Sequence, residues 1–301
     1  MRLQIPTQAL ALTGALALAA CGEGPSDSAP AQGGPNPNTA TAILNAGVMA
    51  ELGEGAGPDT RPVKFLFDPL YDDHYGAFEI PPDDLIETII TGAPPYDGVT
   101  AVFVSHAHGD HFSESQLIRM LTEQPDLIMV APGQALEQLR DVPEWDEALA
   151  QRIRTIELEN GEAAESFTLA GATIEAFRSP HNGWPDRHAG VHNITFRVSA
   201  PAGEGLSARV MHLGDADPAS VHYAALDAFL AAQRTSLAMV PYWHYADEDF
   251  DTLLDDTFNA EAAVAMHVPI NAPVYLAEGN EDGSRPYFNG IGQMIEIVPV
   301  K

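Results

Sequence analysis

The segment SHAHGDHF at residues 105–112 holds the side chains of this sequence that are best suited to chemistry. His106, His108, Asp110 and His111 place three imidazoles and a carboxylate within six positions, a density that folding alone does not require. Imidazole nitrogens and carboxylate oxygens are ligands that suit zinc and similar divalent cations. Protonation of several such groups in one loop is unfavourable because the charges repel, whereas a bound cation would hold all four together. The segment therefore predicts a metal site.

Local patterns place this segment in a loop between a buried strand and a helix. Residues 99–105 (VTAVFVS) are strand-like because of their β-branched and aromatic content. Ser113 to Gln116, ahead of the apolar residues LIRML, has the form of a capping box, so we expect a helix to begin immediately after Phe112. A loop held by two such elements presents polar side chains from a rigid scaffold.

The rest of the domain alternates short apolar runs with helical patterns, which indicates a mixed α/β architecture. Further helices are predicted at residues 81–90 and 221–233. Further strands are predicted at residues 63–68, 172–177, 193–199, 208–213, 236–241 and 263–268.

Charge and composition limit the classes of partner. The 301 residues include 14 Lys and Arg against 43 Asp and Glu, which gives a formal net charge of −29. A polyanion of this size repels phosphate backbones, so we do not expect nucleic acid as a partner. The 45% hydrophobic content is that of a globular protein. No pattern indicates an oligomeric state.

The first residues indicate export. Arg2 precedes an apolar run at residues 8–20 that is too short to span a bilayer, and the run ends in LAAC at residues 18–21. This pattern resembles a bacterial lipoprotein signal. The resemblance implies cleavage before Cys21, a lipid on Cys21, and attachment to the cell envelope by that anchor only. Gly22 after the cysteine favours the outer membrane and periplasm. A plain secretory signal with an incidental cysteine is the alternative.

These features divide the chain into three parts. We expect a signal peptide at residues 1–20 and then the lipidated cysteine with a flexible tether at residues 21–40, which are rich in Gly, Pro, Ser and Asn. No comparable break recurs later, so residues 41–301 are predicted to form one domain.

The HxHxDH pattern of residues 106–111, in its strand–loop–helix context, resembles the signature of the metallo-β-lactamase-fold hydrolases. The resemblance implies a four-layer αββα sandwich and a metal-dependent hydrolase. Four further segments are similar to the broad branch with ascorbate-lactone hydrolase-like proteins and phosphodiesterase relatives: FDPLY at 67–71, HLGDAD at 212–217, PYW at 241–243 and AMHVP at 265–269.

The resemblance also implies two metal ions and a set of ligands. The first metal is assigned His106, His108 and His181; the second is assigned Asp110, His111 and His267, with Asp215 bridging the two. Zinc is expected in both positions, although iron and manganese accept the same ligands.

Two of these assignments are choices among neighbours. We prefer His181 to His188 and His192 because it directly follows a predicted strand. We prefer Asp215 to Asp217 because the preceding glycine permits a tight turn.

The chemistry expected of such a pair of cations is hydrolysis. Two cations about 3.5 to 4 Å apart share a water, lower its pKa toward about 7, and present a metal-bridging hydroxide to an ester, a lactone or a related bond. Asp110 would orient this hydroxide and carry a proton to the leaving group. Asp68 is either a partner of a ligand histidine or a turn residue fixed by Pro69. The resemblance implies that zinc β-lactamases of the best-known subclass use a thiolate ligand for the second metal. Because Cys21 is the only cysteine, the site expected here contains no thiolate, which disfavours β-lactam cleavage as the main activity.

A small molecule is the expected substrate, but few residues indicate how it is recognised. The loops that follow His181 and the PYW segment should form the rim of the metal cleft. Their side chains supply either an apolar wall or packing beneath the rim: Trp184, Arg187, Tyr242, Trp243, His244 and Tyr245. His74, Tyr75 and His222 are assigned no role. Phosphodiester or phospholipid hydrolysis with the same metals is the rival activity. A non-catalytic metal-binding surface lipoprotein is the rival from another class.

Overall fold

The computed structural model describes residues 38–53, 62–281 and 283–301. The predicted signal peptide, Cys21 and the tether up to residue 37 lie outside the described residues. The domain begins with strand β1 (Thr39–Leu44), two residues before the predicted boundary at residue 41. Thr39 belongs to the domain because it is buried and pairs with a strand on each side. Within the described ranges, no helix is long and apolar enough to cross a bilayer.

Two mixed sheets lie at the centre of the described domain. One has the strand order β13-β1-β2-β3-β4-β5-β6 and the other β12-β11-β10-β9-β8-β7. Strands β3 to β6 run parallel in the first sheet, and β10 to β12 run parallel in the second. The remaining strands are β2 (Gly47–Leu52), β3 (Val63–Phe67), β4 (Val99–Phe103), β5 (Ile128–Pro132), β6 (Ile153–Ile156), β7 (Glu165–Leu169), β8 (Ala172–Arg178), β9 (Ile194–Pro201), β10 (Ser207–His212), β11 (Leu237–Pro241), β12 (Ala263–Met266) and β13 (Met294–Glu296).

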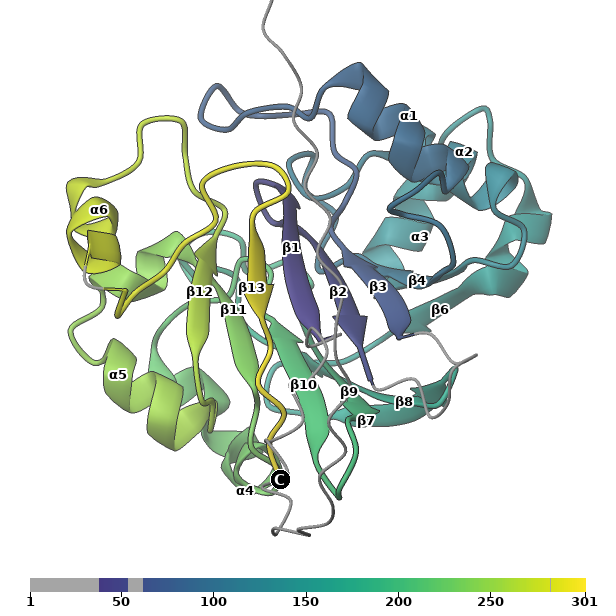
Figure 1. Ribbon diagram of the computed structural model, residues 1–301. Helices are drawn as coiled ribbons and strands as arrows, with labels where there is room; N and C mark the ends of the chain where they lie inside the picture. Colours follow the sequence, from purple (N-terminus) through teal and green to yellow (C-terminus); the bar gives the residue numbers. More distant parts are fainter. Residues whose placement is uncertain (1–37, 54–61, 282) are drawn as a thin grey trace, which may run out of the picture. The chain divides into compact units, whose positions relative to one another are not determined.

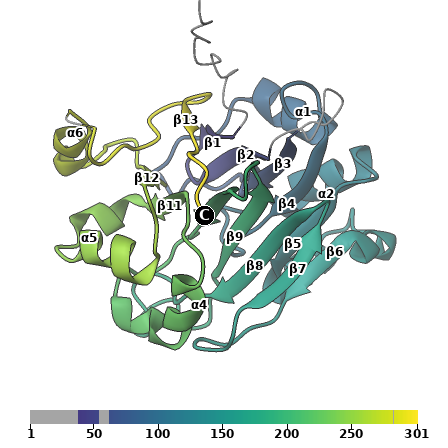
Figure 2. The ribbon, with the colours of Figure 1, turned by 60° about the horizontal axis from the view of Figure 1, so that its bottom comes forward.

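Helices cover the outer face of each sheet. Helices α1, α2 and α3 lie on the first sheet, and α4, α5 and α6 lie beside the second (Figures 1 and 2). The bounds are α1 (Asp83–Thr91), α2 (Glu114–Glu123), α3 (Gly133–Arg140), α4 (Asp227–Ala231), α5 (Phe250–Thr252), α6 (Val274–Glu281), the 3₁₀ turns η1 (Glu147–Arg152), η2 (Ser220–Leu226) and η3 (Tyr242–Ala246), and the π turn η4 (Leu253–Thr257). This order of layers confirms the predicted αββα sandwich.

Alternation along the strands builds the layers. In β3, Phe65 and Phe67 point into the core between the sheets, whereas Leu66 packs under α1 and α2. The Phe65 and Phe67 rings contact Phe103 of β4 at centroid distances of 5.7 and 5.0 Å. Each fully buried side chain of this size contributes about 1.5–3 kcal/mol to folding. The parallel strands are therefore buried on both faces, and their ends are fixed in position.

The predicted strands and the start of α2 are confirmed, but two local predictions are wrong. Ser113 makes no capping hydrogen bond, because its hydroxyl donates to Asp72 Oδ2 at 2.7 Å. The single helix predicted at residues 221–233 is divided into η2 and the short α4. The buried Tyr223 anchors the first half of this segment, where its hydroxyl donates to the Asp217 carbonyl at 2.7 Å.

Candidate metal centre

The loop after β4 is shaped by its backbone. The His111 amide donates to the His108 carbonyl at 2.9 Å, which closes a turn. Gly109 lies in this turn against the loop that contains Asp73, and a Cβ on Gly109 would approach the Asp73 Cβ to 2.8 Å. Only glycine allows this close approach. The turn places the histidines and Asp110 at the carboxyl end of β4.

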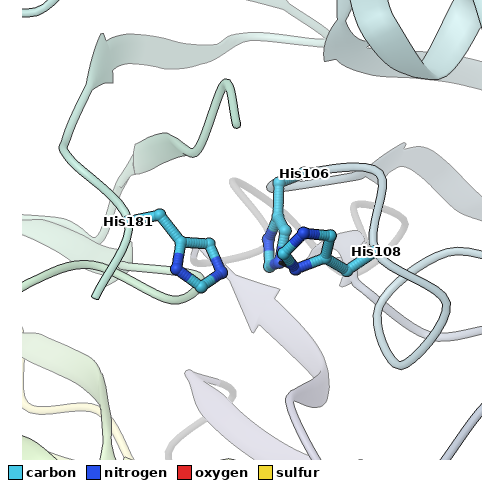
Figure 3. A group of neighbouring side chains, drawn as sticks. All are labelled: His106, His108 and His181. Atoms are coloured by element: carbon cyan, nitrogen blue, oxygen red, sulfur yellow. Dashed lines mark hydrogen bonds between the residues drawn. The ribbon is translucent and has the colours of Figure 1, made fainter. Parts of the chain in front are cut away.

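Three histidines form the first group of donor atoms. One ring nitrogen from each of His106, His108 and His181 lies within 4.8 Å of the others. His181 follows β8, and its ring faces the rings of His106 and His108 from the opposite side (Figure 3). The ring centroids of His106 and His181 are 5.0 Å apart, and those of His108 and His181 are 4.9 Å apart. His106 and His181 are buried, and His108 is half-buried.

Asp110, His111 and His267 form the second group, again with donor atoms within 4.8 Å of one another. His267 Nε2 lies 3.1 Å from Asp110 Oδ2. His267 follows β12 with φ of +61°, a left-handed conformation that is uncommon for histidine. Phe78 and Trp243 pack against its ring at centroid distances of 4.2 and 5.5 Å. These contacts hold the strained residue in place.

Asp215 lies between the two groups. Its Oδ2 atom is 3.9 Å from His106 Nε2 and 3.4 Å from His181 Nε2. Its Oδ1 atom is 3.1 Å from His111 Nε2 and 3.3 Å from His267 Nε2. Each carboxylate oxygen therefore faces a different group, as a bridging ligand requires.

Gly214 gives Asp215 this position. Gly214 has φ of +57°, and a Cβ there would lie 2.3 Å from Asn193 Oδ1 and 2.6 Å from the Ser105 Cβ. The Asp215 amide then donates to Asn193 Oδ1 at 2.9 Å. The glycine is needed both for its conformation and for its lack of a side chain.

The atoms that point into this centre fit cations better than one another. Nε2 of His111, His181 and His267 and Oδ1 of Asp215 are buried, and none makes a hydrogen bond. The short distances of His111 and His267 to Asp215 do not have hydrogen-bond geometry. A buried polar atom without a partner costs about 1–3 kcal/mol, so several together demand an explanation. A bound divalent cation satisfies nitrogen and oxygen donors at once, and the residues present therefore fit a metal.

The electrostatics of the cluster favour neutral imidazoles in the first group. Burial, with a contribution from His111, lowers the pKa of His106 well below its usual range. Burial and then the neighbouring His181 lower the pKa of His108 to about 4. Neutral imidazoles are the form that binds a metal, so little proton release is needed here.

The second group is different because carboxylates surround it. Burial disfavours the imidazolium of His111, but Asp215 and Asp110 outweigh burial and raise its pKa well above the usual value. Burial also disfavours ionised Asp215, yet His267 and His111 lower the pKa of this carboxyl well below its usual range. A bound cation would balance the same carboxylates.

Asp68 supports the second group from behind. It is fully buried, and its Oδ2 atom accepts from His111 Nδ1 at 2.8 Å. Ser105 donates to it twice, from the backbone amide at 2.7 Å and from Oγ at 2.6 Å. This fixes the His111 ring with Nε2 directed inward, an arrangement common for metal-bound histidines. Of the two readings of Asp68, the structure supports the partner of a ligand histidine.

The neighbours of the preferred residues lie outside the donor groups. The exposed His188 packs its ring 4.4 Å from that of His181, and the His192 amide donates to Gln134 Oε1 at 2.9 Å. Asp217 accepts from the Ala219 amide at 3.0 Å and lies 3.4 Å from His222 Nε2. The structure thus brings together the seven predicted residues and leaves the competing ones aside.

A cleft of about 430 Å³ opens onto the donor groups. It is lined by Tyr75, Phe78, His108, Asp110, His181, Asn182, Arg187, His188, Asp215, Trp243 and His267. Trp243 and Arg187 therefore lie at the rim, as predicted, while Trp184 and Tyr242 are half-buried and absent from this lining. Phe78 and Tyr75 come from a loop without a periodic pattern, so no local signal indicated that they line the cleft.

His244 does not lie at the rim, and of the two alternatives for these aromatic side chains it follows the second, packing beneath the rim. His244 is fully buried, and its Nε2 lies 3.0 Å from the Ala216 carbonyl oxygen. The turn η3 directs Trp243 to the cleft and the following His244 into the core of the outer layer. Tyr245 is buried as well, with its hydroxyl bonded to the Pro286 carbonyl at 2.9 Å.

Fold and site together define a class of protein. A family model described as a β-lactamase superfamily domain matches residues 64–277, and the chain therefore belongs to the β-lactamase superfamily. Membership of this superfamily, with the cluster of histidine and aspartate donors, supports a metal-dependent hydrolase.

Solved structures share the fold at low sequence identity. Igni18, a metallo hydrolase from the hyperthermophilic archaeon Ignicoccus hospitalis, is 14% identical with a TM-score of 0.50, over 86% of this chain and 97% of Igni18. CmlA, a diiron β-hydroxylase from Streptomyces venezuelae, is 11% identical with a TM-score of 0.52, over 88% of this chain and 55% of CmlA. A comparison with curated proteins gave no match.

Proposed function

We propose that this protein is a binuclear, zinc-dependent hydrolase that cleaves a small ester, a lactone or a related bond. The observation that carries the proposal is the convergence of buried donor atoms without hydrogen-bond partners, arranged as two groups with Asp215 between them. His106, His108 and His181 would hold one cation; Asp110, His111 and His267 would hold the other.

When bound, two such cations supply an activated water and polarise the oxygen of the scissile bond. The chain's own residues set the geometry of this reaction. The Asp110 carboxylate lines the cleft, and the opposing charges of His111 and His267 keep its pKa low despite burial. It is therefore an acceptor that orients the attacking water and takes its proton. Phe78 and Trp243 reduce access of bulk water from the side of His267.

The test combines metal analysis with two substrate panels. The protein loaded with zinc, iron or manganese is assayed against esters and lactones and, separately, against phosphodiesters. We expect two equivalents of metal, turnover of at least one ester or lactone, and loss of turnover with chelator. Turnover of phosphodiesters alone would reverse the order of the two activities. Full metal occupancy without any turnover would favour the non-catalytic alternative.

A pair of variants tests the role of Asp110, which we assign both to the second cation and to the proton transfer. Asp110→Ala should lower kcat by about 100-fold or more, as expected for loss of an acid–base group. Asp217→Ala is the matched control, because Asp217 is a neighbouring carboxylate outside the donor groups. The control should retain both metals and wild-type kcat. Unchanged turnover in Asp110→Ala with metal still bound would contradict the assigned role.

Location is a second proposal, and its support is the sequence of the first residues alone. We propose export and attachment to the envelope through a lipid on Cys21. Cys21→Ser should move the protein from the membrane fraction to the soluble fraction of the periplasm. Mass spectrometry of the mature N-terminus would identify the lipid, and an unmodified cysteine would leave the plain secretory signal as the better interpretation.

A further inference from the structure

One cation in the cleft has no partner. Every other arginine of the described residues donates to a carboxylate, a hydroxyl or a backbone carbonyl, whereas Arg187 makes no side-chain hydrogen bond or ion pair. The partnered arginines are Arg119, Arg140, Arg152, Arg154, Arg178, Arg197, Arg209, Arg234 and Arg285. In a chain with a net charge of −29, an unpaired guanidinium is an unusual feature.

Arg187 is held in place although its charge is unpaired. Its amide donates to the Gly183 carbonyl at 2.8 Å, and the Trp184 amide donates to the His181 carbonyl at 3.0 Å. These bonds form a folded turn that begins at the candidate ligand His181. A Cβ on Gly183 would lie 3.1 Å from both Arg187 Nε and Nη2, so the guanidinium rests on the Gly183 backbone. The turn therefore fixes the backbone of Arg187 relative to His181, and the exposed guanidinium lies beside Gly183.

The guanidinium lies at the cleft together with Asp110 and Asp215, yet neither carboxylate pairs with it. Arginine presents several N–H donors in a planar fork that matches a carboxylate or a phosphate group. Phe78 and Trp243 line the same cleft with apolar rings.

We propose that Arg187 binds an anionic group of the substrate, so that the preferred substrate is an ester or lactone bearing a carboxylate. This inference rests on the proposed hydrolase function and names its substrate class. The anionic group would contact the guanidinium, the scissile bond would lie over the donor groups, and apolar atoms would contact Phe78 and Trp243. Phosphate oxygens share this chemistry, and the test distinguishes the two sources.

The experiment compares a matched pair of substrates on the metal-loaded protein. The neutral member is 4-nitrophenyl butyrate, and the anionic member is mono-4-nitrophenyl glutarate. Arg187→Gln should lower kcat/KM for the glutarate ester by about 10- to 100-fold, the loss expected for a charge-assisted hydrogen bond. It should change kcat/KM for the butyrate ester less than twofold, and Arg187→Lys should recover part of the difference. Arg119→Gln is the control, because Arg119 of α2 is an exposed arginine that pairs with Glu87 of α1.

A binding arm keeps this inference separate from the proposed function. Titration of the metal-loaded protein with glutarate, glutaramide and methyl phosphate measures anion recognition without turnover. Wild-type binding of glutarate that is lost in Arg187→Gln, with glutaramide not bound, supports the assignment even if no ester is cleaved. Stronger dependence on Arg187 for methyl phosphate than for glutarate would overturn the carboxylate in favour of a phosphate group. Equal effects of Arg187→Gln on the neutral and anionic esters, or anion binding that survives the substitution, would refute the proposal.

Discussion

Asp68→Asn tests how the second group of ligands is supported. Asp68 is fully buried and accepts three hydrogen bonds, two from Ser105 and one from His111 Nδ1 at 2.8 Å. An asparagine of the same size retains an acceptor for Ser105 but presents no negative charge to His111. The imidazole then loses its fixed orientation and part of its basicity.

These contacts determine how much metal affinity the Asp68→Asn variant loses and which of the two cations is affected. Loss of such a supporting carboxylate lowers metal affinity by about 10- to 100-fold, or about 1.4–2.8 kcal/mol. Asp68 contacts His111 directly, whereas it reaches His106 only through Ser105, whose Oγ lies 3.0 Å from His106 Nδ1. The second cation should therefore be weakened more than the first.

The assay is a competitive titration of zinc against a chromophoric chelator. Wild type should show two binding steps, and Asp68→Asn should retain one step while the other shifts by the stated factor. Asp72→Asn is the control. Asp72 is a carboxylate of the same loop, but it accepts a hydrogen bond from Ser113 and not from a ligand histidine. Thermal unfolding identifies a variant that has lost its fold. A folded Asp68→Asn protein with wild-type affinity for both cations, or with loss of the first cation alone, would refute the reasoning.

Three further changes have defined outcomes. Gly214→Ala places a Cβ 2.3 Å from Asn193 Oδ1, so it should lower the free energy of unfolding by about 1–3 kcal/mol in denaturant titrations. Gly190→Ala is its control and should change this free energy little, because a Cβ there meets nothing within 4 Å. Burial lowers the pKa of His244 from 6.5 to about 4 in the folded protein, so its neutral form contributes stability above pH 6.5 that is lost as pH falls toward 4. In metal-free protein, the loss of unfolding free energy between pH 7 and pH 4 should be smaller by about 3 kcal/mol in His244→Gln than in wild type, and equal losses would show that His244 is not responsible. Trp243→Ala removes an apolar wall of the cleft and should raise KM for an aryl ester by about tenfold; an unchanged KM in protein with both metals bound would remove Trp243 from substrate binding.

The parts of the site that the sequence predicted well are those that depend on local spacing. HxHxDH lies in one loop, and the strand before it and the helix after it each have a local pattern, so the turn at residues 106–111 followed directly. The convergence of His181, Asp215 and His267 depends instead on how strands β8, β10 and β12 are ordered in a sheet. No local pattern carries this order, and the family resemblance supplied it.

The predictions that the structure does not bear out also have specific physical causes. His244 follows Trp243 in sequence, but one step along a 3₁₀ turn changes the direction of a side chain from the cleft to the core. Strands β2, β5, β6 and β7 were not predicted, and neither were β1, where small residues give a weak pattern, and β13, which is short. The pairing of β1 with β13 joins Ala40 to Ile295, a contact between opposite ends of the domain.

The central claim is that two cations bind to the seven converging residues, and anomalous diffraction at the zinc edge tests it most directly. Crystals of the zinc-loaded protein should show two peaks about 3.5–4 Å apart. One peak should lie about 2.0–2.2 Å from the donor atoms of His106, His108 and His181, and the other at the same distance from those of Asp110, His111 and His267, with an oxygen of Asp215 directed to each. A single peak, or zinc held by His188 or Asp217 in place of these residues, would contradict the account.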